Sequence, residues 1–167
     1  NVKDMSYMFH TAEEFNQEVG NWDTSNVTDM QFMFINCYKF TNNDSTSIEN
    51  WNTSQVTNMS RLFSMCILFN HNISTKTVTK DDGTKYRAWD TSSVENMSHL
   101  VQNNDNNTGI FNQYIGNWDT SNVTDMTAMF IHQDVFNQDI STKTITNDID
   151  GSTYTAWDVS KVIKLNQ

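Results

Sequence analysis

Apolar and polar residues follow one another in the same order five times along this chain. Each copy starts with a Trp, continues with a short polar stretch, and places Val five residues after the Trp and Met eight residues after it. The last copy is weaker and ends in Leu. The copies occupy residues 22–30, 51–59, 89–97, 118–126 and 157–165. Self-similarity at a period of a few tens of residues predicts a stack of repeats, in which each copy covers its neighbours.

The apolar pattern continues beyond each Met. In the first full copy Met30 is followed by Met33, Phe34 and Phe40. Spacings of three, four and seven residues predict one face of a short helical turn. Next comes a Phe-Asn pair with an aliphatic residue three positions after the Asn, a stretch that is too short for a helix and predicts a short strand. A second short strand is predicted over residues 27–30 and their equivalents.

Two copies carry a longer insertion with the signature of a β-hairpin. Residues 73–89 and 140–157 each place alternating segments on both sides of an Asp-Gly pair. Asp-Gly favours a tight turn between antiparallel strands, so each insertion is predicted to be a hairpin. The Trp-to-Trp spacings alternate between about 29 and about 38 residues because only every second copy carries a hairpin.

The repeat resembles a known family. Residues 117–126 read Asn-Trp-Asp-Thr-Ser-Asn-Val-Thr-Asp-Met, and Met-Phe and Phe-Asn-Gln-Asp-Ile-Ser follow within residues 129–141. This string is similar to the repeat of the BspA-like leucine-rich-repeat surface proteins, and closest to the branch found in mycoplasma surface lipoproteins. The resemblance covers essentially the whole chain. It implies a right-handed, leucine-rich-repeat-like solenoid displayed outside the cell, and adhesion or host-protein binding for some members. It supplies no catalytic residues.

The expected fold is therefore a mixed α/β repeat solenoid, a right-handed coil of short parallel strands and short helical turns with two inserted hairpins. Residues 1–167 are expected to form one solenoid segment of about five rungs that starts and ends inside a repeat. The expected location is the cell surface or the secreted fraction, as part of a longer chain.

Composition narrows the classes of partner. The net charge is −10, which disfavours nucleic acid and anionic membrane surfaces, because both are bound mainly through Lys and Arg. No apolar run approaches the ~20 residues of a membrane-spanning helix, so no direct membrane insertion is expected in this segment. The sequence has no Pro, which suits a continuous backbone ladder.

The repeated apolar positions are predicted to share one interior. In the short copies the Trp falls in phase with the aliphatic residue three positions before it and the Val five positions after it. Cys37 and Cys66 occupy equivalent places, and stacked free thiols are favoured over a disulfide. The predicted core residues are Trp22, Trp51, Trp89, Trp118, Trp157, Val27, Val56, Val94, Val123, Phe34, Phe63 and Phe130.

The Asp that follows most of the Trp residues would form a column of carboxylates along the stack. Capping of turns by Asp and Ser is the favoured interpretation, because these side chains bond to nearby backbone amides. A calcium-stabilised solenoid is the minor alternative. No cofactor and no resident metal are predicted otherwise, since the two Cys do not make a zinc site.

The predicted function is a non-enzymatic cell-surface module that binds a macromolecular partner, an extracellular protein or a glycan. The four His residues share no column and do not accompany a consistent Ser or Cys, so no catalytic triad is predicted. The hairpins carry the exposed-looking cationic and aromatic residues typical of binding hot spots. These candidates are Lys76, Lys85, Tyr86, Arg87, Lys143 and Tyr154. The alternative is a structural spacer or an antigenically variable coat without a dedicated ligand.

Overall fold

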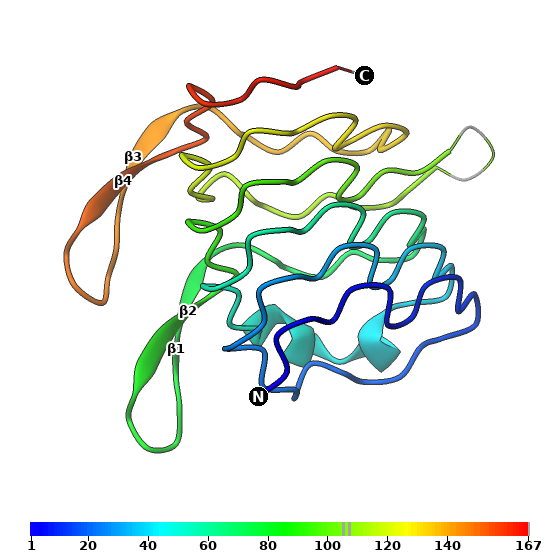
Figure 1. Ribbon diagram of the computed structural model, residues 1–167, viewed down its shortest axis with the longest axis horizontal. Helices are drawn as coiled ribbons and strands as arrows, with labels where there is room; N and C mark the ends of the chain where they lie inside the picture. The colour runs from blue at the N-terminus through cyan, green and yellow to red at the C-terminus, as the bar shows by residue number, and fades with distance from the viewer. Residues whose placement is uncertain (105, 107, 167) are drawn as a thin grey trace.

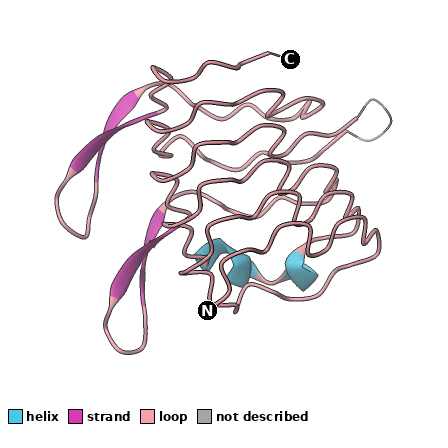
Figure 2. Cartoon of the chain, in the orientation of Figure 1, coloured by secondary structure: helices cyan, strands magenta, loops and turns pink. Residues whose placement is uncertain are grey.

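The computed structural model describes residues 1–104, 106 and 108–166. Successive copies of the repeat lie side by side from the N terminus to the C terminus, and two hairpins leave them on one side (Figure 1). Most of the chain is turn and loop (Figure 2). The named elements are the 3-10 helices η1 (Asn42–Asp44) and η2 (Thr46–Asn50) and the strands β1 (Lys76–Thr79), β2 (Lys85–Ala88), β3 (Lys143–Thr146) and β4 (Thr153–Ala156).

The expected right-handed, leucine-rich-repeat-like coil of parallel strands and helical turns is wrong. Across the described ranges the structure has no α-helix, and its only sheets are the two antiparallel hairpins, β1 with β2 and β3 with β4. The fold is a stack of irregular windings built from turns, and it is not a mixed α/β coil.

Consecutive β-turns explain the helix-like spacing. The amide of Met33 donates to the carbonyl of Met30 at 3.3 Å, and that of Cys37 donates to Phe34 at 3.0 Å. The third residue of each turn has a positive φ, 57° at Phe32 and 62° at Asn36, as in a type II turn. The residue with positive φ stands at the third position of each turn, so the backbone cannot continue as a helix. The side chains of the first and fourth residues of the turn, such as Met30 and Met33, are nevertheless buried in the interior.

Single backbone bridges replace the predicted parallel strands. Each parallel bridge joins one residue to its equivalent in the next copy, and none of these bridges extends into a strand. Additional amides reach across the copies, such as Phe32 to the Ser60 carbonyl at 2.9 Å and Phe34 to Leu62 at 3.0 Å. The parallel bridges join Asp4 to Asp29, Asp29 to Asn58, Asn58 to Asn96, Asn96 to Asp125 and Asp125 to Lys164.

Aromatic columns form the interior of the stack. Phe15, Phe40, Phe69, Phe111 and Phe136 follow one another with centroid distances of 5.9, 6.1, 6.3 and 6.1 Å. Such offset ring contacts add stability beyond the burial of apolar area. Val27, Val56, Val94, Val123, Phe34 and Phe63 are all buried beside them.

The Trp residues bind each copy to the one before it. In four of the five Trp residues, all except Trp22, the indole Nε1 donates to the carbonyl of the aliphatic residue that precedes the Trp of an earlier copy, which satisfies a buried donor. The pairs are Trp51 with Val19 at 3.3 Å, Trp89 with Ile48 at 3.0 Å, Trp118 with Ile73 at 2.8 Å and Trp157 with Ile115 at 2.9 Å.

Two residues predicted for the core lie at its margins. Trp22 is 38% exposed; the ring of Phe9 lies 5.9 Å from it, centroid to centroid, and no indole of an earlier copy stands against it among the described residues. Phe130 is half-buried and packs against the core beside Trp157, at a centroid distance of 6.4 Å. The prediction of burial is therefore wrong for Trp22 and only partly correct for Phe130.

Both hairpins form where the Asp-Gly pairs predict them. β1 pairs with β2 and β3 with β4 in antiparallel register, with Val78 opposite Tyr86 and Ile145 opposite Tyr154. Gly83 has a φ of 82° in the first hairpin turn, a conformation that side chains rarely adopt. The thiols of Cys37 and Cys66 are free and buried, as the favoured interpretation of the sequence holds.

Candidate functional site

One Tyr fixes each hairpin to the stack. The hydroxyl of Tyr86 donates to the carbonyl of Asn50 at 2.6 Å, and that of Tyr154 donates to Asn117 at 2.6 Å. Asn50 and Asn117 each stand directly before a Trp, so the two attachments are equivalent. Burial raises the pKa of both Tyr side chains, which keeps them protonated as donors. The two hairpins therefore form one fixed face, called here the hairpin face.

Arg87 joins the first hairpin to the second. Its guanidinium carbon lies 4.8 Å from the centroid of the Tyr154 ring, and Nη2 donates to the Tyr154 hydroxyl at 2.8 Å. Nη1 lies 3.8 Å from a carboxylate oxygen of Asp90. The hydroxyl of Thr77 also donates to Asp148 across the two hairpins. These contacts couple hairpins that are far apart in the sequence.

The lysines of the hairpins divide into paired and exposed groups. Lys76 lies 3.3 Å from Glu49. Lys143 lies 3.3 Å from Asp139 and 5.4 Å from the centroid of the Tyr114 ring. Lys85 is exposed.

Five of the six predicted binding residues are less exposed in the structure than the sequence predicts. They do share one face, but the expectation of free exposure holds only for Lys85. The other five are partly buried and contact groups of the same chain, which gives them a structural role. Their role in binding stays a prediction.

Each hairpin has a polar groove on its N-terminal side. The first groove, about 430 Å³, includes Trp22, Asp23, Asn50, Asn52, Lys80 and Tyr86. The second groove, about 260 Å³, lies between the hairpins and includes Thr77, Arg87, Asn117, Asn147, Asp148 and Tyr154.

Sequence reasoning missed Trp22, Asp23 and Lys80 as residues of a groove. No local sequence signal indicates that these three residues meet. In the groove, Lys80 Nζ lies 5.6 Å from the centroid of the Tyr86 ring. Hydrogen bonds from Ser25 and, to a lesser extent, the charge of Lys80 hold the pKa of Asp23 below its ordinary value.

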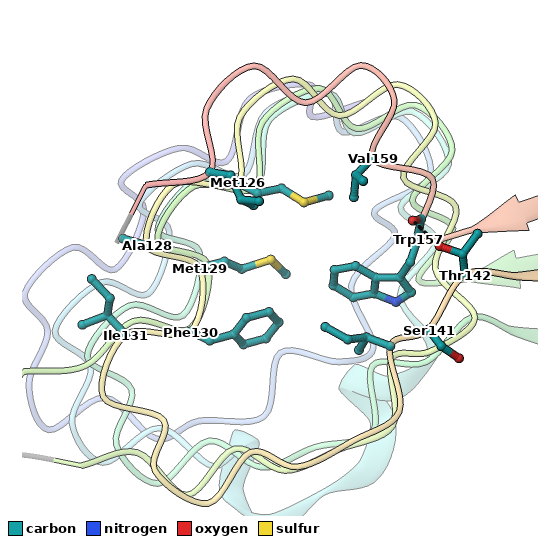
Figure 3. A pocket seen from close by; sticks show the side chains of 11 residues that line it. Met126, Ala128, Met129, Phe130, Ile131, Ser141, Thr142, Trp157 and Val159 are labelled. Atoms are coloured by element: carbon teal, nitrogen blue, oxygen red, sulfur yellow. Dashed lines mark hydrogen bonds between the residues drawn. The ribbon is translucent and has the colours of Figure 1, made fainter.

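A cavity of about 600 Å³ lies at the C-terminal end of the apolar interior (Figure 3). Met126, Met129 and Phe130 face Trp157 across it, and Ser141 and Thr142 stand at its edge. The described residues that line it include no titratable group. It continues the apolar core, and its described lining offers no acid or base.

Asp and Asn side chains after the Trp residues cap turns. Asp23 accepts from the amide of Ser25 at 3.1 Å, and Asn52 accepts from Ser54 at 3.1 Å. The equivalent Asp90, Asp119 and Asp158 make the same contact. The capping interpretation is therefore confirmed. Within the described ranges, no three His, Cys, Asp or Glu side chains gather in a way that could hold a metal ion.

Residues 1–87 and again residues 76–167 match the family described as "Mycoplasma protein of unknown function, DUF285". The chain belongs to this family. The two matches to DUF285 overlap only around the first hairpin, which fits a unit repeated in tandem. No curated protein and no solved structure matches the chain. Among the described residues, no helix has the length and apolar character needed to cross a bilayer.

Proposed function

We propose that this chain is a non-enzymatic repeat module, displayed at the cell surface or secreted, that binds an extracellular protein or glycan through its hairpin face. The fixed hairpin face is the observation that carries this proposal. Two insertions at equivalent places are held on one side by the same Tyr-to-carbonyl contact. A surface that is ordered before binding loses less conformational entropy when a partner docks.

The contrast between the repeated side chains and the side chains that occur only on the hairpins supports the same function. The repeated Trp and Thr side chains bond to the backbone of this chain, so their polar groups are already used. The hairpins and grooves instead carry side chains that differ from copy to copy, such as Lys85 and Lys80. Specific recognition needs such unrepeated groups. Within the DUF285 family, we place the chain nearest the BspA-like surface proteins, whose repeat its sequence resembles.

A binding screen with the whole chain tests this function. The chain is applied to immobilised extracellular-matrix proteins and to a glycan array, and any binding is repeated with Lys85→Glu. Lys161→Glu is the matched control, because Lys161 is also exposed but lies outside the hairpins. Saturable binding that is weakened by Lys85→Glu and retained by Lys161→Glu supports the proposal. Equal loss in both variants, or no binding to any surface, contradicts it.

A structural spacer or coat is the second candidate function. It is favoured by the five hairpin residues that contact groups of this same chain instead of solvent. In that case the hairpins stiffen the stack, and no ligand appears in the screen. Removal of a hairpin would then change only the stability of the chain.

A further inference from the structure

The two grooves of the hairpin face are equivalent in the repeat. Each is closed on its C-terminal side by a hairpin Tyr, Tyr86 in the first and Tyr154 in the second. Each Tyr bonds to the Asn that stands one copy earlier. The residue directly after the Trp two copies earlier is an Asp in both cases: Asp23 lines the first groove, and Asp90 lies 3.8 Å from Arg87, which lines the second.

The second groove contains its own cation, and the first lacks the equivalent residue. Arg87 stands two residues before Trp89 and places its guanidinium between Tyr154 and Asp90. Two residues before Trp22 the chain has Gly20. A Cβ at Gly20 would lie 2.1 Å from the backbone nitrogen of Ile48, so no side chain can reach the first groove from that position. The aromatic ring and the carboxylate of the first groove remain without a guanidinium.

We infer that the first groove binds the guanidinium group of an arginine on the partner, in the way that Arg87 fills the second groove. This inference rests on the proposed function and names the chemistry of the partner, a protein segment that displays Arg. The Tyr86 ring offers a face for the planar cation, and Asp23 offers the opposite charge. The net charge of −10 attracts basic segments from a distance.

Lys80 is the group that the arginine would replace. Its ammonium lies over the Tyr86 ring, but the side chain is exposed and comes from the hairpin turn. In the second hairpin the equivalent residue, directly after the first strand, is Asn147, which leaves the ring to Arg87. Removal of the Lys80 ammonium should therefore tighten binding of an incoming guanidinium. Loss of any cation also increases the general attraction of the chain for a cation, so a larger effect at Lys80 than at the exposed Lys161 identifies the groove.

The experiment follows the five indole N–H signals by ¹H–¹⁵N NMR while N-acetyl-arginine methylamide is added. Trp22→Phe assigns the signal of Trp22, the half-exposed indole beside the groove. The probe is kept below the concentrations at which guanidinium unfolds proteins. We expect a saturable shift of the Trp22 signal alone, and a weaker response to N-acetyl-lysine methylamide, because the planar guanidinium stacks on aromatic faces better than an ammonium.

Matched variants test the two contacts. Asp23→Asn should weaken binding about threefold through loss of the charge. Its turn is preserved, because Asn52 makes the same 3.1 Å contact at the equivalent position. Asp158→Asn, the same change in the last copy, should leave binding unchanged. Lys80→Ala should tighten binding about threefold, whereas Lys161→Ala should not.

Several outcomes would overturn the inference. They are a shift that does not saturate, equal shifts for the arginine and lysine probes, or equal effects of Asp23→Asn and Asp158→Asn. If the probe fails while the whole chain still binds a matrix protein or a glycan through Lys85, the groove inference fails and the proposed function stands. If the probe binds the groove and the surface screen finds no partner, the groove stands and the proposed function fails.

Discussion

The guanidinium carbon of Arg87 lies 4.8 Å from the centroid of the Tyr154 ring, and its Nη2 donates a 2.8 Å hydrogen bond to the Tyr154 hydroxyl. The two residues belong to different hairpins, so this contact is a polar link between the hairpins, beside that of Thr77 with Asp148. The Arg87 side chain is only 13% exposed, which reduces screening by solvent and strengthens the interaction. The second hairpin is thus positioned by the first.

A double-mutant cycle measures this link. Arg87→Met keeps most of the apolar stem, and Tyr154→Leu removes the ring and the hydroxyl. We expect a coupling free energy of about 1–2 kcal/mol from urea unfolding of the two single variants and the double variant. The control cycle pairs Lys85→Met with Tyr154→Leu, and its coupling should stay below about 0.5 kcal/mol. Additive effects in the first cycle would mean that the hairpins do not stabilise each other.

Trp118 and Trp22 should differ strongly in their contribution to stability, although both start a copy of the repeat. Trp118→Phe leaves a gap in the core and removes the 2.8 Å bond to the Ile73 carbonyl. We expect a loss of about 2–4 kcal/mol in the free energy of unfolding. Trp22→Phe should cost about 0.5 kcal/mol or less, since Trp22 is 38% exposed. Similar losses at the two positions would contradict this arrangement of the core.

The interior and the hairpins follow from the sequence, but the local backbone does not. Repeated Val, Met and Phe positions indicate which side chains are buried, and Asp-Gly pairs locate the turns. A spacing of three and four residues, however, is shared by a helix and by consecutive β-turns. The turns here need positive φ at Phe32, Arg61 and Ala128, where no sequence rule expects it, because such residues disfavour that region.

The site was only partly predictable for a related reason. Residue type alone points to Arg87, Tyr86 and Tyr154 as binding residues. It cannot distinguish a side chain that contacts a partner from one that contacts another part of the same chain. That distinction depends on the register of copies, which brings Arg87 to a Tyr two copies later. Lys80 and Asp23 meet at a groove for the same reason, and nothing in their local sequence indicates it.

Buried and exposed Thr columns should differ in their contribution to stability. The hydroxyl of buried Thr91 donates to the Asp119 carbonyl at 3.0 Å, whereas exposed Thr124 donates to Glu95 at 3.2 Å. Thr91→Val keeps the shape but leaves a buried carbonyl without this donor, at a cost of about 1–2 kcal/mol. Thr124→Val should change the free energy of unfolding by less than about 0.5 kcal/mol, because water replaces the lost bond. Urea unfolding of both variants checks the difference, and equal costs would count against it.

The two thiols should be unreactive in the folded chain. Burial raises the pKa of Cys37 to about 12 and that of Cys66 well above its ordinary value, so little thiolate exists at pH 8. Iodoacetamide should label neither residue of the native protein and should label both in denaturant, as read by mass spectrometry. Rapid labelling of the native chain would contradict the buried positions.

Acid should destabilise the fold through the carboxylates that cap turns. Hydrogen bonds from the Ser or Thr two residues later lower the pKa of Asp4, Asp23, Asp82, Asp139 and Asp150. A folded pKa below the unfolded value means that the unfolded chain binds protons first as pH falls. The stabilisation is therefore complete above the unfolded pKa of about 3.9 and is lost as pH falls through the folded pKa values, which for Asp139 is about 2.

The urea concentration at the midpoint of unfolding should decrease as the pH is lowered from 5 to 2.5, and the decrease should be smaller in Asp139→Asn. Carboxyl NMR titration should place Asp139 near its low value in the wild type and higher in Ser141→Ala. Two results would show that these hydrogen bonds do not stabilise the charged carboxylates. One is a urea midpoint that rises on acidification, and the other is an Asp139 pKa that is the same in the wild type and in Ser141→Ala.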